Sequence, residues 1–183
     1  MVPTPENEDR LVELAMTGDF DAFAALYSLH LNTIYRYIYY RTGDAQDAED
    51  LTEQVFLKAW EALSHYKPAG CRFINWLYRI SHNIVVDHHR RRKFIVDEPI
   101  SDAKLPGKVQ DMALEMVIRA EEAASLAAAI ARLPEEYQQV IILRFIEGLG
   151  HAEVARILEK SEVACRGIQY RALTFLNQIL AGS

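Results

Sequence analysis

Apolar side chains recur at spacings of three and four residues along most of the chain, and this period predicts α-helices. We find no segment in which apolar and polar residues alternate as they would in a half-buried strand. The predicted helices cover about residues 8–16, 20–42, 45–63, 71–94, 111–133, 134–148, 151–159 and 162–180. The pattern therefore predicts an all-α fold.

Start and stop signals fit these borders. Gly18 favours the left-handed stop of a first helix, and the Asp19 side chain can cap the next one. Gly43 and Asp44 repeat this arrangement before the third helix. The helix order is therefore supported by capping chemistry as well as by period.

Residues 95–108 contain two prolines, a glycine and scattered acids without helical period, which is typical of a linker. The sequence thus predicts two helical domains joined by a flexible linker, with borders at 1–94, 95–110 and 111–183. In the second domain, two short amphipathic segments flank the turn at Lys160 and Ser161. This layout predicts a helix-turn-helix.

Composition excludes several classes of protein. The 183 residues are 50% hydrophobic and 25% charged, with eight Gly and six Pro, which argues against a fibrous or largely disordered chain. The chain has no run of about 18 apolar residues, so the sequence does not predict membrane insertion. The acid-rich start, residues 1–10, lacks the pattern of a secretory signal, so we expect a cytoplasmic protein. The two cysteines are far apart in the sequence, and no nucleophile–base signature is found. We therefore expect no metal site, no cofactor and no enzymatic activity.

The formal net charge of −6 argues at first against a nucleic-acid partner. However, residues 66–93 hold seven basic side chains and one acidic side chain, whereas residues 1–65 hold four and twelve. The densest basic run is 90–93. Such a run can bind phosphates, although an isolated one is also favourable as a solvated helix end.

The helix predicted over 71–94 places an aromatic ring among polar side chains. Arg72, Trp76, Arg79, Asn83 and Asp87 share one face, opposite an apolar stripe. An indole can stack on an unpaired base, a contact worth roughly 1–3 kcal/mol, while Arg binds phosphate and Asn reads a base edge. The alternative is that Trp76 packs against a neighbouring helix.

The second helix of the predicted helix-turn-helix carries side chains that suit duplex DNA. Ser161 can cap this helix and leave its N-terminal N–H groups facing a phosphate. Its exposed side is predicted to present Arg166, Gln169, Tyr170 and Arg171, of which Arg and Gln can read base edges in the major groove. A helical hairpin with no DNA partner is the alternative.

Four motifs, in this order, resemble the extracytoplasmic-function (ECF) class of bacterial RNA polymerase sigma factors. They lie at 47–60, 73–92, 133–149 and 151–158 and read DAEDLTEQVFLKAW, FINWLYRISHN to DHHRRR, LPEEY to LRFIEGL, and HAEVARIL. The resemblance covers nearly the whole chain. It implies a sigma factor that directs core RNA polymerase to promoters and stabilises the open complex for transcription initiation.

The resemblance also implies partners and contact residues. The partners would be core RNA polymerase, promoter DNA and an anti-sigma factor. The implied core-polymerase contacts are Asp47, Asp50, Leu51, Gln54, Phe56 and Trp60. Contacts to the melted minus-ten element would come from Trp76, Arg79, Asn83 and Asp87, with Arg90, Arg91, Arg92 and Lys93 on phosphates and the 64–70 loop assisting. Contacts to the minus-thirty-five element would come from Ser161, Arg166, Gln169, Tyr170 and Arg171.

This chain departs from the family pattern at several positions. It has Glu53-Gln54 where the family usually has Gln-Glu, and Glu159 where the helix-turn-helix usually has Gly. If the turn stays left-handed, a non-Gly residue there costs on the order of 1 kcal/mol. The last helix also has the unusual residues Val163, Cys165 and Gly167. They affect which promoter sequence this helix would read more than they affect the fold.

Two other functions fit the same helices. A DNA-binding repressor or activator would use only the last two helices and bind duplex DNA without polymerase. A helical adaptor would bind protein only. For a sigma factor, the acidic average predicts weak DNA binding in the absence of polymerase.

Overall fold

The computed structural model describes residues 5–67, 72–95 and 114–181, and every regular element in these ranges is a helix. The predicted all-α fold is thereby confirmed. The helices are α1 (Pro5–Met16), α2 (Phe20–Thr42), α3 (Ala45–Ala62), the 3-10 turn η1 (Leu63–His65), α4 (Phe73–Ile95), α5 (Leu114–Ala131), α6 (Glu135–Ile141), the π-helical turn η2 (Ile142–Ile146), α7 (His151–Leu158) and α8 (Glu162–Ala181).

The capping signals act as the sequence predicts. The Asp19 carboxylate accepts a hydrogen bond from the Ala22 N–H at 3.0 Å, and the Asp44 carboxylate accepts one from the Asp47 N–H at 2.9 Å. Gly43, which ends α2, has a φ of 72° that side chains with a Cβ rarely adopt. These local contacts fix where α2 ends and α3 begins, and hence the angle between them.

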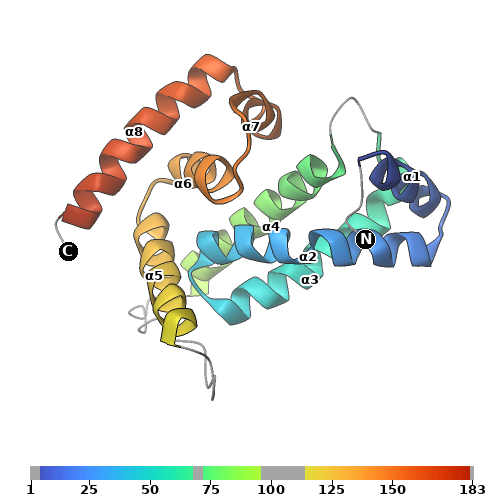
Figure 1. The fold of residues 1–183 in the computed structure, drawn as a ribbon, viewed down its shortest axis with the longest axis horizontal. Helices are drawn as coiled ribbons and strands as arrows, with labels where there is room; N and C mark the ends of the chain where they lie inside the picture. Colours follow the sequence, from blue (N-terminus) through green and yellow to red (C-terminus); the bar gives the residue numbers. More distant parts are fainter. Residues whose placement is uncertain (1–4, 68–71, 96–113, 182–183) are drawn as a thin grey trace.

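The first domain packs α1, α3 and α4 around α2 (Figure 1). Its core contains fully buried apolar side chains from three of these helices, including Leu26, Ile34, Val55 and Leu77. Burial of each such side chain contributes about 1.5–3 kcal/mol. The packing fixes α3 against α4 and leaves one face of each helix outside the core.

In the second domain, α8 packs against α6 and α7, around buried Leu143, Val154 and Ile168. The turn after α7 passes through Glu159 in the left-handed region, at φ 54° and ψ 42°. The chain therefore adopts, with a non-glycine residue, the left-handed turn whose cost the sequence predicts.

The second domain lies against the first. α5 contacts α2 near its C-terminal end, and α7 contacts α4 (Figure 1). Buried apolar residues of both domains form one continuous cluster. The predicted linker and the start of the second domain fall almost entirely in residues 96–113, outside the described residues.

Within the described residues, no helix combines the length and the apolar character needed to cross a membrane.

Candidate nucleic-acid interface

The start of α4 holds an aromatic cluster at the predicted minus-ten face. The Trp76 ring is half-buried, 4.8 Å from the ring of Tyr66 and 5.5 Å from that of Phe73. Tyr66 follows η1, so the loop and α4 together orient the indole. One side of the ring therefore packs against a loop residue and a residue of α4 itself, and the rest of the ring stays accessible, so stacking on a base stays a prediction.

Three arginines of α4 are already engaged by acidic or carbonyl groups. Arg79 Nη2 donates to the backbone oxygen of Arg156 at 2.8 Å, and Arg92 Nη1 donates to the Asp47 carboxylate at 2.9 Å. Arg90 lies 3.0 Å from the Asp87 carboxylate. These pairs partly neutralise the basic surface of the chain when no partner is bound. Lys93 lies outside the residues whose side chains are described.

Two of the exposed nucleic-acid contacts predicted on α4 are not engaged by another group. Asn83 and Arg91 are exposed, and the structure gives neither an ion pair nor a hydrogen bond through its side chain. They lie on α4 with Arg79 and Asp87, so the helix presents the polar face that its spacing predicts.

The structure separates the predicted polymerase contacts on α3 into two groups. Asp50 and Gln54 are exposed on the outer face of the helix. Leu51 and Phe56 are only 5% and 3% exposed, because they pack into the core that holds α3 in place. Both are thus placed to position α3 rather than to touch a partner directly.

The ends of α3 show how the remaining predicted contacts are held. The Asp47 carboxylate pairs with Arg92 and lies 3.3 Å from His88 Nε2. Trp60 is half-buried, and its ring lies 4.9 Å from that of Phe23. Leu57 is 59% exposed on the outer face, and sequence analysis did not select it, although its i+3 spacing from Gln54 was a usable signal.

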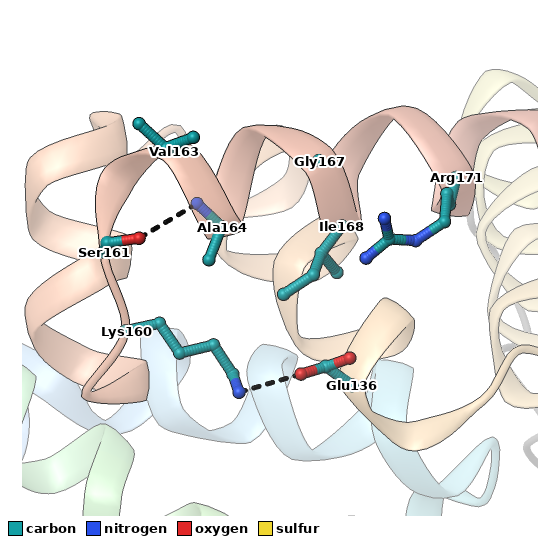
Figure 2. A pocket seen from close by; sticks show the side chains of 8 residues that line it. All are labelled: Glu136, Lys160, Ser161, Val163, Ala164, Gly167, Ile168 and Arg171. Carbon is teal, nitrogen blue, oxygen red and sulfur yellow. Dashed lines mark hydrogen bonds and ion pairs between the residues drawn. The ribbon is translucent and has the colours of Figure 1, made fainter.

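The N-terminal end of α8 borders an open hollow of about 450 Å³ (Figure 2). Ser161 Oγ accepts a hydrogen bond from the Ala164 N–H at 3.1 Å, so Ser161 caps α8 as predicted. Across the hollow, Lys160 Nζ lies 2.8 Å from the Glu136 carboxylate, and Arg171 lies at the opposite end. The hollow thus has a cation at each end, and most of the residues between them are small or aliphatic.

Three of the predicted minus-thirty-five contacts on α8 are exposed. Arg166, Tyr170 and Arg171 point to solvent, and Arg166 makes only a loose pair with Glu162 at 3.7 Å. These side chains are accessible to solvent, and their contact with duplex DNA stays a prediction.

Gln169 differs from its neighbours because its amide oxygen is already bound. Arg144 Nε lies 3.2 Å from it and His151 Nε2 lies 3.1 Å from it. Since an arginine N–H can only donate, the acceptor must be the amide oxygen, and the Gln169 NH₂ group is left for another partner. Arg144 and His151 are not predicted from the sequence, because their contact with α8 is tertiary.

A buried carboxylate of the second domain, Glu147, faces α4. Tyr78 donates its O–H to this carboxylate at 3.3 Å. Burial, assisted by the charge of Glu147, raises the pKa of Tyr78 far above its usual range, so the phenol stays a donor. Within the described residues, no group of three His, Cys, Asp or Glu side chains has an arrangement that could hold a metal ion.

Comparisons with known proteins match both domains in order. The family model of Sigma-70 region 2 matches residues 26–95, and that of Sigma-70 region 4 matches residues 123–176. The first match contains α3 and α4, and the second contains α7 and most of α8. The two matched segments thus contain all the candidate contact residues described above.

Curated relatives cover most of the chain. It is 37% identical to the ECF RNA polymerase sigma factor BldN of Streptomyces coelicolor over 93% of this chain, and spans 64% of the length of BldN. It is 30% identical to the ECF RNA polymerase sigma factor SigW of Bacillus subtilis, over 77% of this chain and 79% of SigW.

A solved structure has a similar fold over both domains. The structure of CnrH in complex with the cytosolic domain of CnrY superposes with a TM-score of 0.73 at 25% identity, covering 94% of this chain and 96% of CnrH. Together, the two region matches, the identity to SigW and the shared fold show that this chain belongs to the ECF family of RNA polymerase sigma factors.

Proposed function

We propose that this chain is a transcription initiation factor, and not an enzyme, that directs core RNA polymerase to specific promoters and stabilises the open complex. The observation that carries the proposal is the half-exposed indole of Trp76 on α4 of a region 2 domain, with Arg79 on the same helix and Arg72 directly before it. A stacking ring flanked by cations is suited to single-stranded DNA, because the ring holds a base while the guanidinium groups hold phosphates.

The outer face of α3 is the proposed binding surface for core polymerase. Asp50, Gln54 and Leu57 are exposed there, so the surface combines a charge, an amide and an apolar side chain. Leu51 and Phe56 support it from below. A basic partner surface with an apolar centre would complement this arrangement.

The exposed side of α8 is the proposed reader of the minus-thirty-five element. In this proposal, base and phosphate contacts come from Arg166, Tyr170 and Arg171, and the capped N-terminus of α8 faces the phosphate backbone of the DNA. Gln169 contributes through its NH₂ group alone, because its oxygen is held by Arg144 and His151.

We also infer a regulatory protein partner of the anti-sigma class, since the similar chain CnrH was solved in complex with the cytosolic domain of CnrY. Because the proposed partners are core polymerase and promoter DNA, the proposed location is the cytoplasm.

Run-off transcription tests the proposal. Purified core polymerase is combined with the full chain and a promoter selected from a random DNA pool by the resulting holoenzyme. We expect a transcript that requires both the chain and its selected promoter. Absence of promoter-dependent transcript, with tight duplex binding by the chain alone, would instead identify a repressor or activator; absence of both DNA binding and transcript would identify an adaptor.

A further inference from the structure

The side chain of Gln169 on α8 is held by side chains from two other elements of the second domain. Its amide oxygen accepts a hydrogen bond from Arg144 Nε of η2 at 3.2 Å, and lies 3.1 Å from Nε2 of His151, the first residue of α7. Arg144 Nη1 also donates to the Leu149 carbonyl, so the guanidinium group is fixed on both sides. The amide of Gln169 is therefore anchored to the segment that leads into α7.

These contacts decide which way the amide points. The group that faces Arg144 must be the oxygen, because a guanidinium group can only donate. His151 must then carry a proton on Nε2, since the same oxygen can only accept. Turning the amide over would place its NH₂ group against the guanidinium group, donor against donor, and both bonds to the oxygen would be lost. The oxygen thus stays towards η2 and α7.

The NH₂ group of Gln169 is left for a ligand. Its nitrogen bonds to no other group among the described residues and is not buried, so it is open to solvent although the residue as a whole is half-buried. Arg166, three residues earlier on α8, is exposed, and residues at this spacing are neighbours on a helix surface. The two N–H donors of the amide therefore lie beside the proposed DNA-reading side of α8.

Base edges in the major groove differ in what they offer to such a group. A glutamine that reads adenine needs both ends of its amide, because the oxygen accepts from N6 while the NH₂ group donates to N7. Guanine presents two acceptors, N7 and O6, whereas thymine presents one acceptor and cytosine presents a donor. A glutamine that offers only its N–H donors therefore matches guanine and cannot make the paired contact with adenine.

We propose that Arg144 and His151 are positioning residues that make Gln169 specific for guanine at one position of the minus-thirty-five element. The inference rests on the proposed function, because it requires that α8 reads duplex DNA. It gives two side chains outside α8 a role in the choice of promoter.

Selection from a random DNA pool by the holoenzyme, followed by sequencing, tests the base assignment. Gln169→Glu replaces the NH₂ group by an acceptor of similar size, so one position of the selected sequence should change from guanine to cytosine, whose N4 group donates. At that position the wild-type chain should prefer guanine over adenine by about five- to 150-fold, as expected for one paired contact. The control Gln178→Glu changes an exposed glutamine later in α8 and should leave the selected sequence unchanged.

The same selection tests the positioning residues. The double variant Arg144→Met, His151→Phe frees the amide oxygen, so adenine should be accepted as well as guanine at the position that Gln169→Glu identifies. His151→Gln keeps an N–H donor and should retain guanine. Arg132→Met removes an exposed arginine of the same domain and should change nothing. Circular dichroism checks that each variant keeps the helix content of the wild type.

The outcomes separate this inference from the proposed function. A wild-type holoenzyme that selects no sequence would overturn both. A selected sequence that Gln169→Glu leaves unchanged, or that has adenine at the position it changes, would overturn the base assignment alone. A folded double variant with the guanine preference of the wild type would overturn the role of Arg144 and His151.

Discussion

Replacing Glu159 by glycine should stabilise the protein relative to replacing it by alanine. Both substitutions remove the ion pair with Arg79, so the difference between them isolates the backbone. At φ 54° and ψ 42°, an L-residue pays a steric cost that glycine does not, and the difference is about 1 kcal/mol. Inside a regular helix, the difference in stability between alanine and glycine has the opposite sign, because alanine is the better helix former.

The difference is measured by urea unfolding followed by circular dichroism at 222 nm. With a slope of about 2 kcal/mol per molar urea, a difference of 1 kcal/mol moves the midpoint by about 0.5 M. Gly167→Ala is the matched control: Gly167 is inside α8, so alanine should raise the midpoint there. If Glu159→Ala were as stable as Glu159→Gly, the left-handed conformation of this turn would be refuted.

Three further predictions concern function and pH. Asp50→Ala should weaken binding to core polymerase without lowering the midpoint of thermal unfolding, because Asp50 is exposed; a pull-down with core enzyme and a melting curve check this, and unchanged binding contradicts the assignment of α3. Trp76→Ala should reduce open-complex formation, measured by permanganate footprinting, by roughly five- to 150-fold, the equivalent of 1–3 kcal/mol of stacking; core binding should persist, and Trp76→Phe should retain part of the activity. Burial, assisted by the charge of Arg41, lowers the pKa of His89 below 6.5, so the unfolded chain takes up the proton first as pH falls. Stability should therefore decrease as pH falls from 6.5 towards the pKa of folded His89, and His89→Gln should flatten this slope in unfolding curves recorded across that range.

Local features were predictable from the sequence because they depend on neighbours within one turn of helix. Asp19, Asp44 and Ser161 cap their helices as expected, since a cap needs only a side-chain oxygen near an N–H three residues on. The periodicity placed most helix borders within a few residues for the same reason.

The state of individual site residues was less predictable. Sequence motifs identify Leu51 and Phe56 with a binding helix, but burial depends on which neighbouring helices cover them. Likewise, the oxygen of Gln169 is bound by side chains 25 and 18 positions earlier in the chain. Such contacts carry no local pattern, so a face can be identified from spacing while the atoms free to bind a ligand cannot.

The π-helical turn η2 sets the direction in which the side chains after it point. The Glu147 N–H bonds to the Ile142 carbonyl five residues earlier, as in an α-helix that has gained one residue. One residue rotates everything after it by about 100° around the helix axis. With this extra residue, Glu147 faces Arg36 while Val140 and Leu143 stay in the core. Deleting one residue of Ile142–Ile146 would restore the regular helical turn and rotate Glu147 away from Arg36.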